Sequence, residues 1–353
     1  MTFDYLRYGS TIGKNYTSGR VGIHHVRNTT LESTALYPFT SAYFTVSRSL
    51  SSSYSSSAHR YGPTQTEVRD WLSGTSNGGG GHSWANTYVD VPTQGYQRWT
   101  VPETATYRIV ARGGHAGYTD SPDDYMRGVT VRADFDLTLG DKLLIAVGQG
   151  VPNYNGDHCN GGAGASWVAL GDTIGTALML LVGNGAGGDT SDGGAKGQPN
   201  TSLNSTVTNV GGVSGLQTTP INSSASIGYG NQSTTYPNSG GYLSAGNDVN
   251  STGTQGGGFR SGNLVGGTRS NSTAGYGGFG GGSGGRDEYG SAGGGFTGAM
   301  GQDNTTVTGH GSSFIRDTGA NQLCVLNNTT TTYQATDYTS HIQYQGTVAV
   351  EKL

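Results

Sequence analysis

Alternation of apolar and polar residues is the clearest pattern in the chain. Between residues 129 and 139 every odd position is apolar and every even position is polar, which is the period of a half-buried β-strand. Gly140 and Asp141 then supply a turn, and residues 143–147 form an apolar return strand. Further short apolar runs, the last of them alternating again, occupy residues 106–110, 166–170, 178–182, 323–326 and 342–350. We therefore predict a mainly β fold, an antiparallel β-sandwich built from residues 93–182 and roughly 312–353.

Residues 1–92 do not share this pattern. One strand over residues 42–47 and one short helix over residues 65–72, capped at Thr64 or Thr66, are the elements that their sequence predicts. The rest is polar and weakly hydrophobic. We interpret residues 1–92 as a small irregular attachment or linker region, followed by a glycine-rich β-sandwich domain over residues 93–353.

Glycine organises a long insertion at residues 183–311. Its spacing is partly ternary, as at Gly275, Gly278, Gly281 and Gly284. A left-handed polyproline-II-type helix turns once every three residues, and glycine on one edge lets neighbouring helices approach closely. A bundle of such polyglycine-II helices, hydrogen-bonded to one another, is our prediction. A flexible Gly/Ser linker is the alternative, although a spacer has no reason to carry the interleaved aromatic residues Phe259, Tyr276, Phe279, Tyr289 and Phe296.

Composition narrows the classes of partner. The chain has 64 Gly among 353 residues, only 12% charged residues and a formal net charge of −4. It offers no dense Lys/Arg face for phosphate, which argues against nucleic acid. Residues 1–10 have no apolar signal region, and the longest apolar run, residues 177–182, is too short to enter a membrane as a spanning helix. Cys159 and Cys324 follow no metal or redox spacing and are expected to be unpaired thiols.

No pattern of catalytic residues stands out. Residues 281–285 match a nucleophile elbow and residues 275–280 a dinucleotide fingerprint, but neither lies between a strand and a helix, so both are chance matches in glycine-rich sequence. We expect no enzymatic activity, no cofactor and no metal. Asp120, Asp123 and Asp124 form the densest acidic group, for which a solvated loop is favoured over a Ca²⁺ site.

Nine short motifs, in order, carry a resemblance to a known family. They occupy residues 95–102, 107–114, 139–149, 161–168, 180–188, 277–282, 293–298, 311–315 and 346–352. Together they resemble the glycine-rich module of the anaplastic lymphoma kinase ectodomain, which also occurs in phage and bacterial surface proteins. The resemblance covers residues 93–353 and implies a β-sandwich carrying bundled glycine helices, with a binding role and no catalysis. The tail-tip adhesins of T-even-like phages use glycine helices similarly, with the connecting loops touching the host.

These observations lead to a functional expectation. The chain is expected to be a phage fibre or tail-tip protein on the virion surface, binding a host-surface glycan or outer-membrane protein. Its loops at residues 115–127 and 151–158 combine aromatic rings with hydrogen-bonding groups. Residues 1–92 would attach it to other virion proteins, with a trimer as the expected assembly, and a chain starting near Val91 would stay folded. The alternative is a purely structural virion decoration, fibre-shaft or surface-filament subunit. The candidate receptor-binding residues are Tyr118, Asp120, Asp123, Asp124, Tyr125, Tyr154, Asn155 and His158.

Overall fold

The chain divides into two units, Met1–Thr34 and Ala35–Leu353, and the description below concerns the second. The structure, a computed structural model, describes residues 34–44, 57–74, 80–116, 128–151, 160–188, 228–230, 232–248, 254–270, 274–286, 290–301, 309–326 and 345–353, together with the backbone of residues 206–207 and 215–217.

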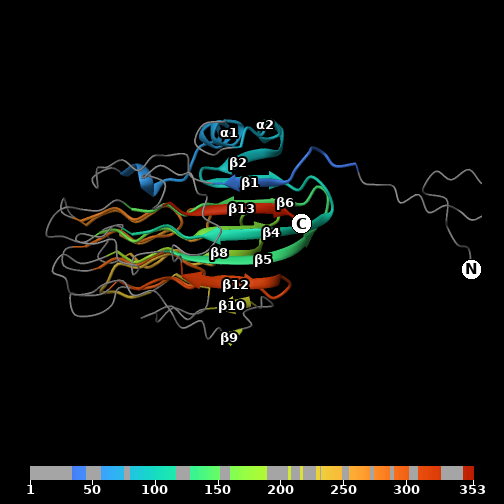
Figure 1. The fold of residues 1–353 in the computed structure, drawn as a ribbon. Helices are drawn as coiled ribbons and strands as arrows, with labels where there is room; N and C mark the ends of the chain where they lie inside the picture. The colour runs from blue at the N-terminus through green and yellow to red at the C-terminus, as the bar shows by residue number, and fades with distance from the viewer. Residues whose placement is uncertain are drawn as a thin grey trace, which may run out of the picture. The chain divides into compact units, whose positions relative to one another are not determined.

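Two antiparallel sheets make up the larger unit (Figure 1). The first, sheet A, has the order β1 (Ser41–Phe44), β13 (Thr347–Lys352), β4 (Ala105–Arg112), β5 (Val129–Leu137) and β12 (Ala320–Leu326). The second, sheet B, has the order β2 (Val89–Thr93), β3 (Tyr96–Thr100), β6 (Lys142–Ala146), β7 (Ser166–Leu170), β8 (Leu178–Gly183), β11 (Phe314–Arg316), β10 (Gly215–Gln217) and β9 (Thr206–Val207). The predicted mainly β architecture with antiparallel sheets is thus confirmed.

Alternation located β5 because one of its faces lies on the core, whereas β6, β7 and β8 were predicted as continuous apolar runs and are buried on both faces. In β5 the side chains of Val131, Ala133 and Phe135 are buried in the cluster between the sheets. Strand β13 is shorter than the predicted run at residues 342–350, whose first three residues lie outside the described part of the chain.

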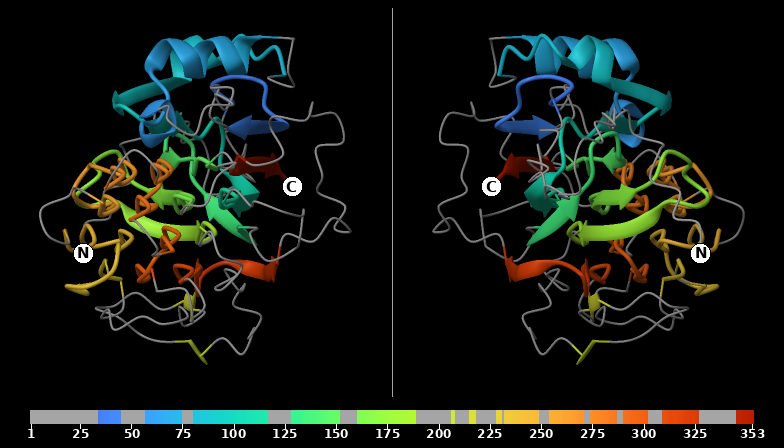
Figure 2. Two further views of the ribbon diagram at one scale, coloured as in Figure 1. Left: turned by 90° about the vertical axis from the view of Figure 1, so that its left-hand side faces the viewer. Right: turned by 90° about the vertical axis from the view of Figure 1, so that its right-hand side faces the viewer.

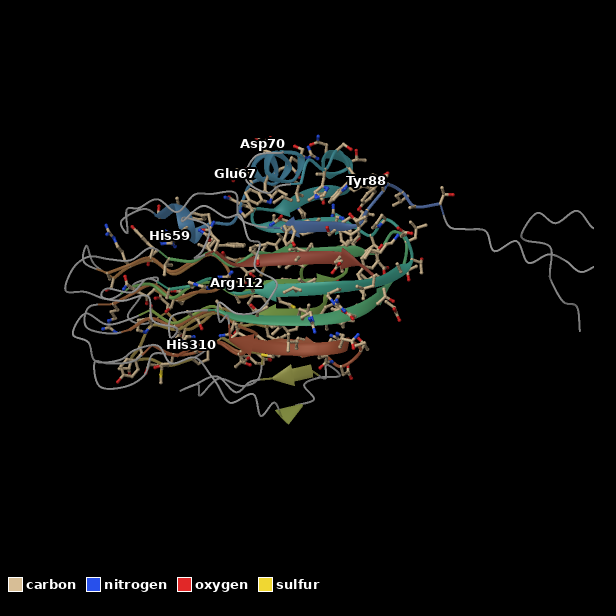
Figure 3. The ribbon with its side chains drawn as sticks, viewed as in Figure 1. His59, Glu67, Asp70, Tyr88, Arg112 and His310 are labelled. Carbon is tan, nitrogen blue, oxygen red and sulfur yellow. The ribbon has the colours of Figure 1, made fainter. Side chains whose placement is uncertain are left out.

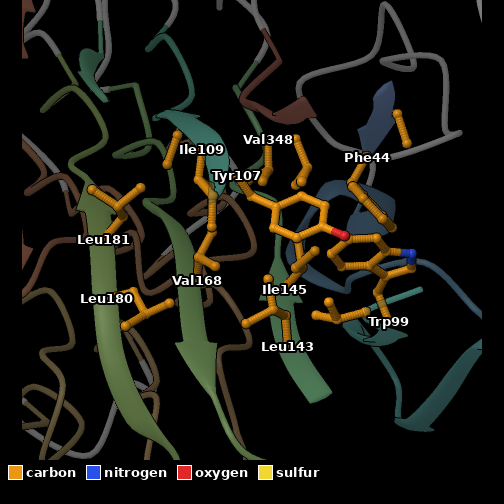
Figure 4. Close-up of a cluster of buried hydrophobic side chains, with 14 of the residues drawn as sticks. Phe44, Trp99, Tyr107, Ile109, Leu143, Ile145, Val168, Leu180, Leu181 and Val348 are labelled. Atoms are coloured by element: carbon orange, nitrogen blue, oxygen red, sulfur yellow. The ribbon is translucent and has the colours of Figure 1, made fainter. Parts of the chain in front are cut away.

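Figure 4 shows the core between the two sheets. Its centre is aromatic: Trp99 of β3 meets the rings of Phe44 and Tyr107 edge-on, at centroid distances of 6.2 and 5.9 Å. Branched aliphatic side chains from both sheets fill the remainder, among them Ile109, Ile145, Val168, Leu181 and Val348. Burial of this apolar surface is the main force that holds the sheets together.

The described residues between 35 and 92 pack in this sandwich, which corrects the expected boundary at residue 92. Strand β1 lies at the edge of sheet A and pairs with β13, Phe44 opposite Val348. The core also takes in aromatic side chains from before β2, namely Tyr37, Phe39, Trp71 and Trp84. The low average apolar content of the segment concealed them, because a few large rings supply most of its buried area.

The helices also lie in this part of the chain: η1 (Ser57–Arg60), α1 (Gln65–Ser73) and α2 (Ala85–Tyr88). The predicted helix and its cap at Thr64 are confirmed. The Thr64 hydroxyl accepts the Glu67 N–H, and Glu67 Oε2 accepts the Thr64 N–H at 2.7 Å, which is a capping box. The indole of Trp71 donates to the carbonyl of Tyr43 in β1 at 3.2 Å, so α1 is fixed to the edge of sheet A.

The glycine-rich insertion covers the outer face of sheet B (Figure 2). Three of its predicted aromatic residues, Phe259, Phe279 and Phe296, are buried there against side chains of β7, β8 and β11. Phe296 stacks on Phe314 of β11 with 4.3 Å between ring centroids. These contacts are incompatible with a free linker, since each ring is almost wholly removed from water.

Between the aromatic residues, segments without helix or strand run side by side and bond through their backbones. The segment at residues 160–165 illustrates the pattern: it exchanges N–H···O bonds of 2.8–2.9 Å with Gly114, Gln149, Ala186, Gly278, Gly280, Ser283 and Gly294. A β-strand has only two neighbours in its sheet, whereas this segment is surrounded. Glycine is required because a Cβ at Gly164 would lie 1.6 Å from the carbonyl oxygen of Phe279.

All of the long connections after β3 leave from one end of the sandwich. Because the strands are antiparallel, the short turns at residues 138–141, 171–177 and 317–319 lie at the opposite end. The connections at residues 113–128, 147–165, 184–205, 218–313 and 327–346 therefore all begin and end at the end away from these turns. The glycine segments described there lie on the left in Figure 1. We call this the loop-bearing end.

Candidate functional site at the loop-bearing end

The two loops predicted to bind a receptor begin side by side. The N–H of Val151 donates to the carbonyl of His115 at 3.0 Å. Ala116 and Val151 pack in one small apolar cluster with Ala163 and Ala186. The described roots of the two loops, residues 115–116 and Val151, are thus held together on neighbouring glycine segments.

The candidate receptor-binding residues themselves, Tyr118, Asp120, Asp123, Asp124, Tyr125, Tyr154, Asn155 and His158, lie outside the described residues. The same holds for the acidic group considered for Ca²⁺ and for Cys159. Cys324 is a free cysteine on β12, and burial raises the pKa of its thiol to about 11.

A second junction joins the far root of the loop at residues 151–158 to two other glycine segments. The N–H of Gly188 donates to the carbonyl of Ser291 at 3.1 Å, and the Ser291 hydroxyl donates to the carbonyl of Asn160 at 2.5 Å. Gly188 precedes the connection at residues 189–205, and Asn160 follows the predicted loop. Backbone bonds rather than a hydrophobic core therefore hold the loop roots in register.

The polar side chain of His115 is also fixed at the root of its loop. A terminal nitrogen of Arg112, at the end of β4, lies 2.7 Å from His115 Nε2. Since a guanidinium can only donate, Nε2 is the acceptor and the ring proton is on Nδ1. Figure 3 shows Arg112 where β4 passes into its glycine segment.

An arginine–tyrosine cluster that the sequence did not predict lies beside these segments. We define it by Arg60, Tyr61, Arg269 and Tyr276. The Arg60 guanidinium carbon lies 5.4 Å from the ring centre of Tyr61 and 5.6 Å from that of Tyr276, and the Arg269 guanidinium carbon lies 5.1 Å from the Tyr276 ring centre. These are cation–π distances. No sequence signal could have found the cluster, because its two halves, Arg60 with Tyr61 and Arg269 with Tyr276, are far apart in the chain and ordinary in isolation.

Buried His59 positions this cluster. His59 Nε2 donates to the carbonyl of Tyr276 at 3.1 Å, and the two rings meet edge-on. Burial lowers the pKa of His59 to about 4, so the imidazole is neutral at pH 7. Arg60 Nε donates to the carbonyl of Gly266 at 2.8 Å, which fixes the guanidinium beside the two rings. Figure 3 shows His59 among the segments on the loop-bearing side.

Ion pairs join several charged side chains elsewhere in the sandwich. Arg108 and Asp134 bond at 2.8 Å, and this partner lowers the pKa of the Asp134 carboxyl. Similar ion pairs join Arg98 to Asp90 and Lys352 to Glu103. By contrast, Arg60 has no carboxylate within ion-pair distance among the residues that the structure describes.

Comparison with protein-family models gives no match to this chain. Within the described ranges no three His, Cys, Asp or Glu side chains gather as a metal site would require. None of the helices described is long and apolar enough to cross a membrane.

Proposed function

We propose that this chain is a non-catalytic attachment protein of a phage virion, a fibre or tail-tip protein that binds a glycan or protein of the host surface. One observation carries the proposal: every long connection after β3 leaves the sandwich at one end, on segments that are bonded to one another through their backbones. Such a frame holds variable loops in fixed positions, as binding proteins generally do.

We further propose that the glycine segments are polyglycine-II helices. Gly161 lies against the carbonyl of Tyr276. Three residues further along both segments, Gly164 lies against the carbonyl of Phe279. Gly162 faces a different neighbour, Ala292. A period of three along both segments, with successive glycines turned toward different neighbours, is the geometry of a left-handed three-residue helix in a bundle.

The attachment role proposed for the N-terminal region is confined to residues before Ala35. Residues 35–92 supply core side chains, so they are not free to serve as a separate connecting segment. We propose that the preceding residues join the chain to other virion proteins, in a trimer displayed on the particle surface.

Cell attachment tests the proposed function. Purified protein, fluorescently labelled, is added to host cells, and its competition with whole particles is measured. Replacing residues 117–127 and 152–159 by short Gly/Ser linkers should abolish attachment without lowering the melting temperature, because the roots are held by the His115–Val151 bond.

The matched control inserts the same linker at Gly140, in the turn at the opposite end, where a Cβ would meet no atom within 4 Å. This variant should attach normally. Folded protein that attaches equally well with and without the two loops would contradict the loop assignment. Folded protein that never attaches, together with particles that infect normally without it, would favour a structural decoration or shaft subunit.

A further inference from the structure

We propose that the arginine–tyrosine cluster is a binding site for an acidic sugar, a saccharide bearing a carboxylate or a phosphate. The assignment names a class of ligand for the proposed attachment function. It rests on that function only in placing the ligand on a host surface. It places a second recognition site beside the glycine segment at residues 160–165, where Gly161 lies against the carbonyl of Tyr276.

The positive charge of the cluster favours an anionic ligand. Two guanidiniums lie over one ring, that of Tyr276, and Arg60 is without a carboxylate partner in the described part of the chain. Its Nε is occupied by Gly266, which leaves the donors on its terminal nitrogens. Guanidinium donors in this fork geometry match the two oxygens of a carboxylate or phosphate.

The aromatic part of the cluster favours a sugar over a free anion. The Tyr61 side chain is exposed, and its residue retains 39% of its accessible surface. An exposed tyrosine ring offers a flat apolar face, against which the C–H face of a pyranose can pack, and a hydroxyl for hydrogen bonding. A ring beside a guanidinium therefore matches a ligand that is apolar on one face and anionic at one edge.

The site is also preorganised. His59 is 5% exposed and bonds the Tyr276 carbonyl, while Arg60 is fixed by its bond to Gly266. Arg60 is therefore oriented before a ligand arrives, which reduces the entropy lost on binding. Surface arginines without such contacts would have to be ordered by the ligand.

Isothermal titration of the full chain tests the site. The acidic probes are the trisaccharide of galacturonic acid and glucose 6-phosphate, and the neutral counterparts are galactotriose and glucose. We expect at least one acidic probe to bind, with an affinity that falls as the salt concentration is raised. Neither neutral counterpart should bind. The substitutions Arg60→Gln and Arg269→Gln should each weaken binding about tenfold or more, since each removes charge-assisted hydrogen bonds.

Two variants guard against indirect effects. Arg260→Gln removes an arginine that lies 4.9 Å from the Tyr242 ring, a comparable cation–π contact outside the cluster, and should leave binding unchanged. Arg60→Lys keeps the charge and loses the fork, so it should bind more weakly than the parent chain. Melting temperatures show whether each variant is folded.

The assignment is overturned if neither acidic probe binds at millimolar concentration, if the neutral sugars bind as well, or if Arg260→Gln loses as much affinity as Arg60→Gln. If a glutamate-rich peptide binds as tightly as the acidic sugars, the ligand of the cluster is an acidic protein surface and not a sugar. If the probes bind as expected and the protein fails to attach to host cells, the site stands and the attachment function does not.

Discussion

Single glycines in the bundle differ in what a side chain would meet, and this difference can be measured. A Cβ at Gly164 would lie 1.6 Å from the Phe279 oxygen, whereas one at Gly175, in an exposed turn, would meet no atom within 4 Å. Neither glycine has a positive φ, so the comparison isolates close packing.

We expect Gly164→Ala to lower the free energy of unfolding by about 3 kcal/mol or more, at the upper end of overpacking costs, because the obstacle is a backbone atom that also accepts a hydrogen bond from Gln149. Gly175→Ala should change it by less than about 1 kcal/mol. Urea denaturation measures both. Equal stability of the two variants would show that the segments are not in close backbone contact.

His59 gives the fold a specific dependence on pH. Its folded pKa, about 4, is below the ordinary value of 6.5 because burial disfavours the charged ring. A depressed histidine pKa means that the unfolded chain binds a proton first as pH falls. The stabilising contribution is therefore complete above pH 6.5 and declines toward pH 4, by about 3 kcal/mol in all.

The substitution His59→Gln, which keeps a donor toward the Tyr276 carbonyl, should flatten this part of the curve of unfolding free energy against pH. His82→Gln is the control: the pKa of His82 is also lowered by burial, but this ring is more exposed and should matter less. If the decline between pH 6.5 and 4 is the same in parent and His59→Gln proteins, another group is responsible for it.

At the scale of elements, the strands were predictable and their partners were not. Alternation identified β5, and short apolar runs identified β4, β6, β7 and β8, because both patterns reflect which side chains meet a core. Neither pattern could place β1 beside β13, because the pattern of a short edge strand does not encode its neighbour. In the bundle, glycine carries no side chain by which one segment could specify another, so pairings such as Gly162 with Ser283 emerge only from the fold.

The candidate site, too, was predictable only in part. The sequence indicated which connections carry aromatic and polar residues, and antiparallel topology brings their roots together at His115 and Val151. It gave no sign of the arginine–tyrosine cluster, whose members come from η1 and from two glycine segments. Contacts between residues so far apart in sequence depend on the whole arrangement of the bundle.

Truncation tests the corrected domain boundary. A chain beginning at Ala35 should keep the melting temperature of the full protein, because it retains all of the described elements. A chain beginning at Val91 loses β1, α1 and the buried rings of Phe39, Phe44 and Trp71. Each large ring removed from a core costs about 3–5 kcal/mol, and together these losses exceed the usual stability of a domain.

The shorter chain should therefore be insoluble or unfolded by circular dichroism. A control with Phe39→Ala alone in the longer chain should fold with reduced stability. It distinguishes the effect of one cavity from the loss of β1, α1 and their core side chains together. Cooperative melting of the chain that begins at Val91 would restore the original boundary at residue 92.

At the scale of the whole larger unit, the sandwich and the glycine bundle have no boundary between them. Strands β4, β6 and β8 pass directly into glycine segments, and β7 and β11 emerge from others. The aromatic residues of the bundle are buried on sheet B, so either part would expose apolar surface if the other unfolded. A separate domain on a linker would show neither feature.

This continuity predicts a single unfolding transition for residues 35–353. Calorimetry should give equal calorimetric and van't Hoff enthalpies, and Gly164→Ala should shift that one transition rather than split it. The Trp99 and Trp167 rings lie on opposite faces of sheet B, one in the core between the sheets and one under the bundle. Chains retaining only one of these indoles, after replacement of the other tryptophans by phenylalanine, should report the same fluorescence midpoint. A lower midpoint for Trp167 would mean that the bundle detaches first. The loop-bearing end could then not hold its loops in the fixed positions that the proposed host binding requires.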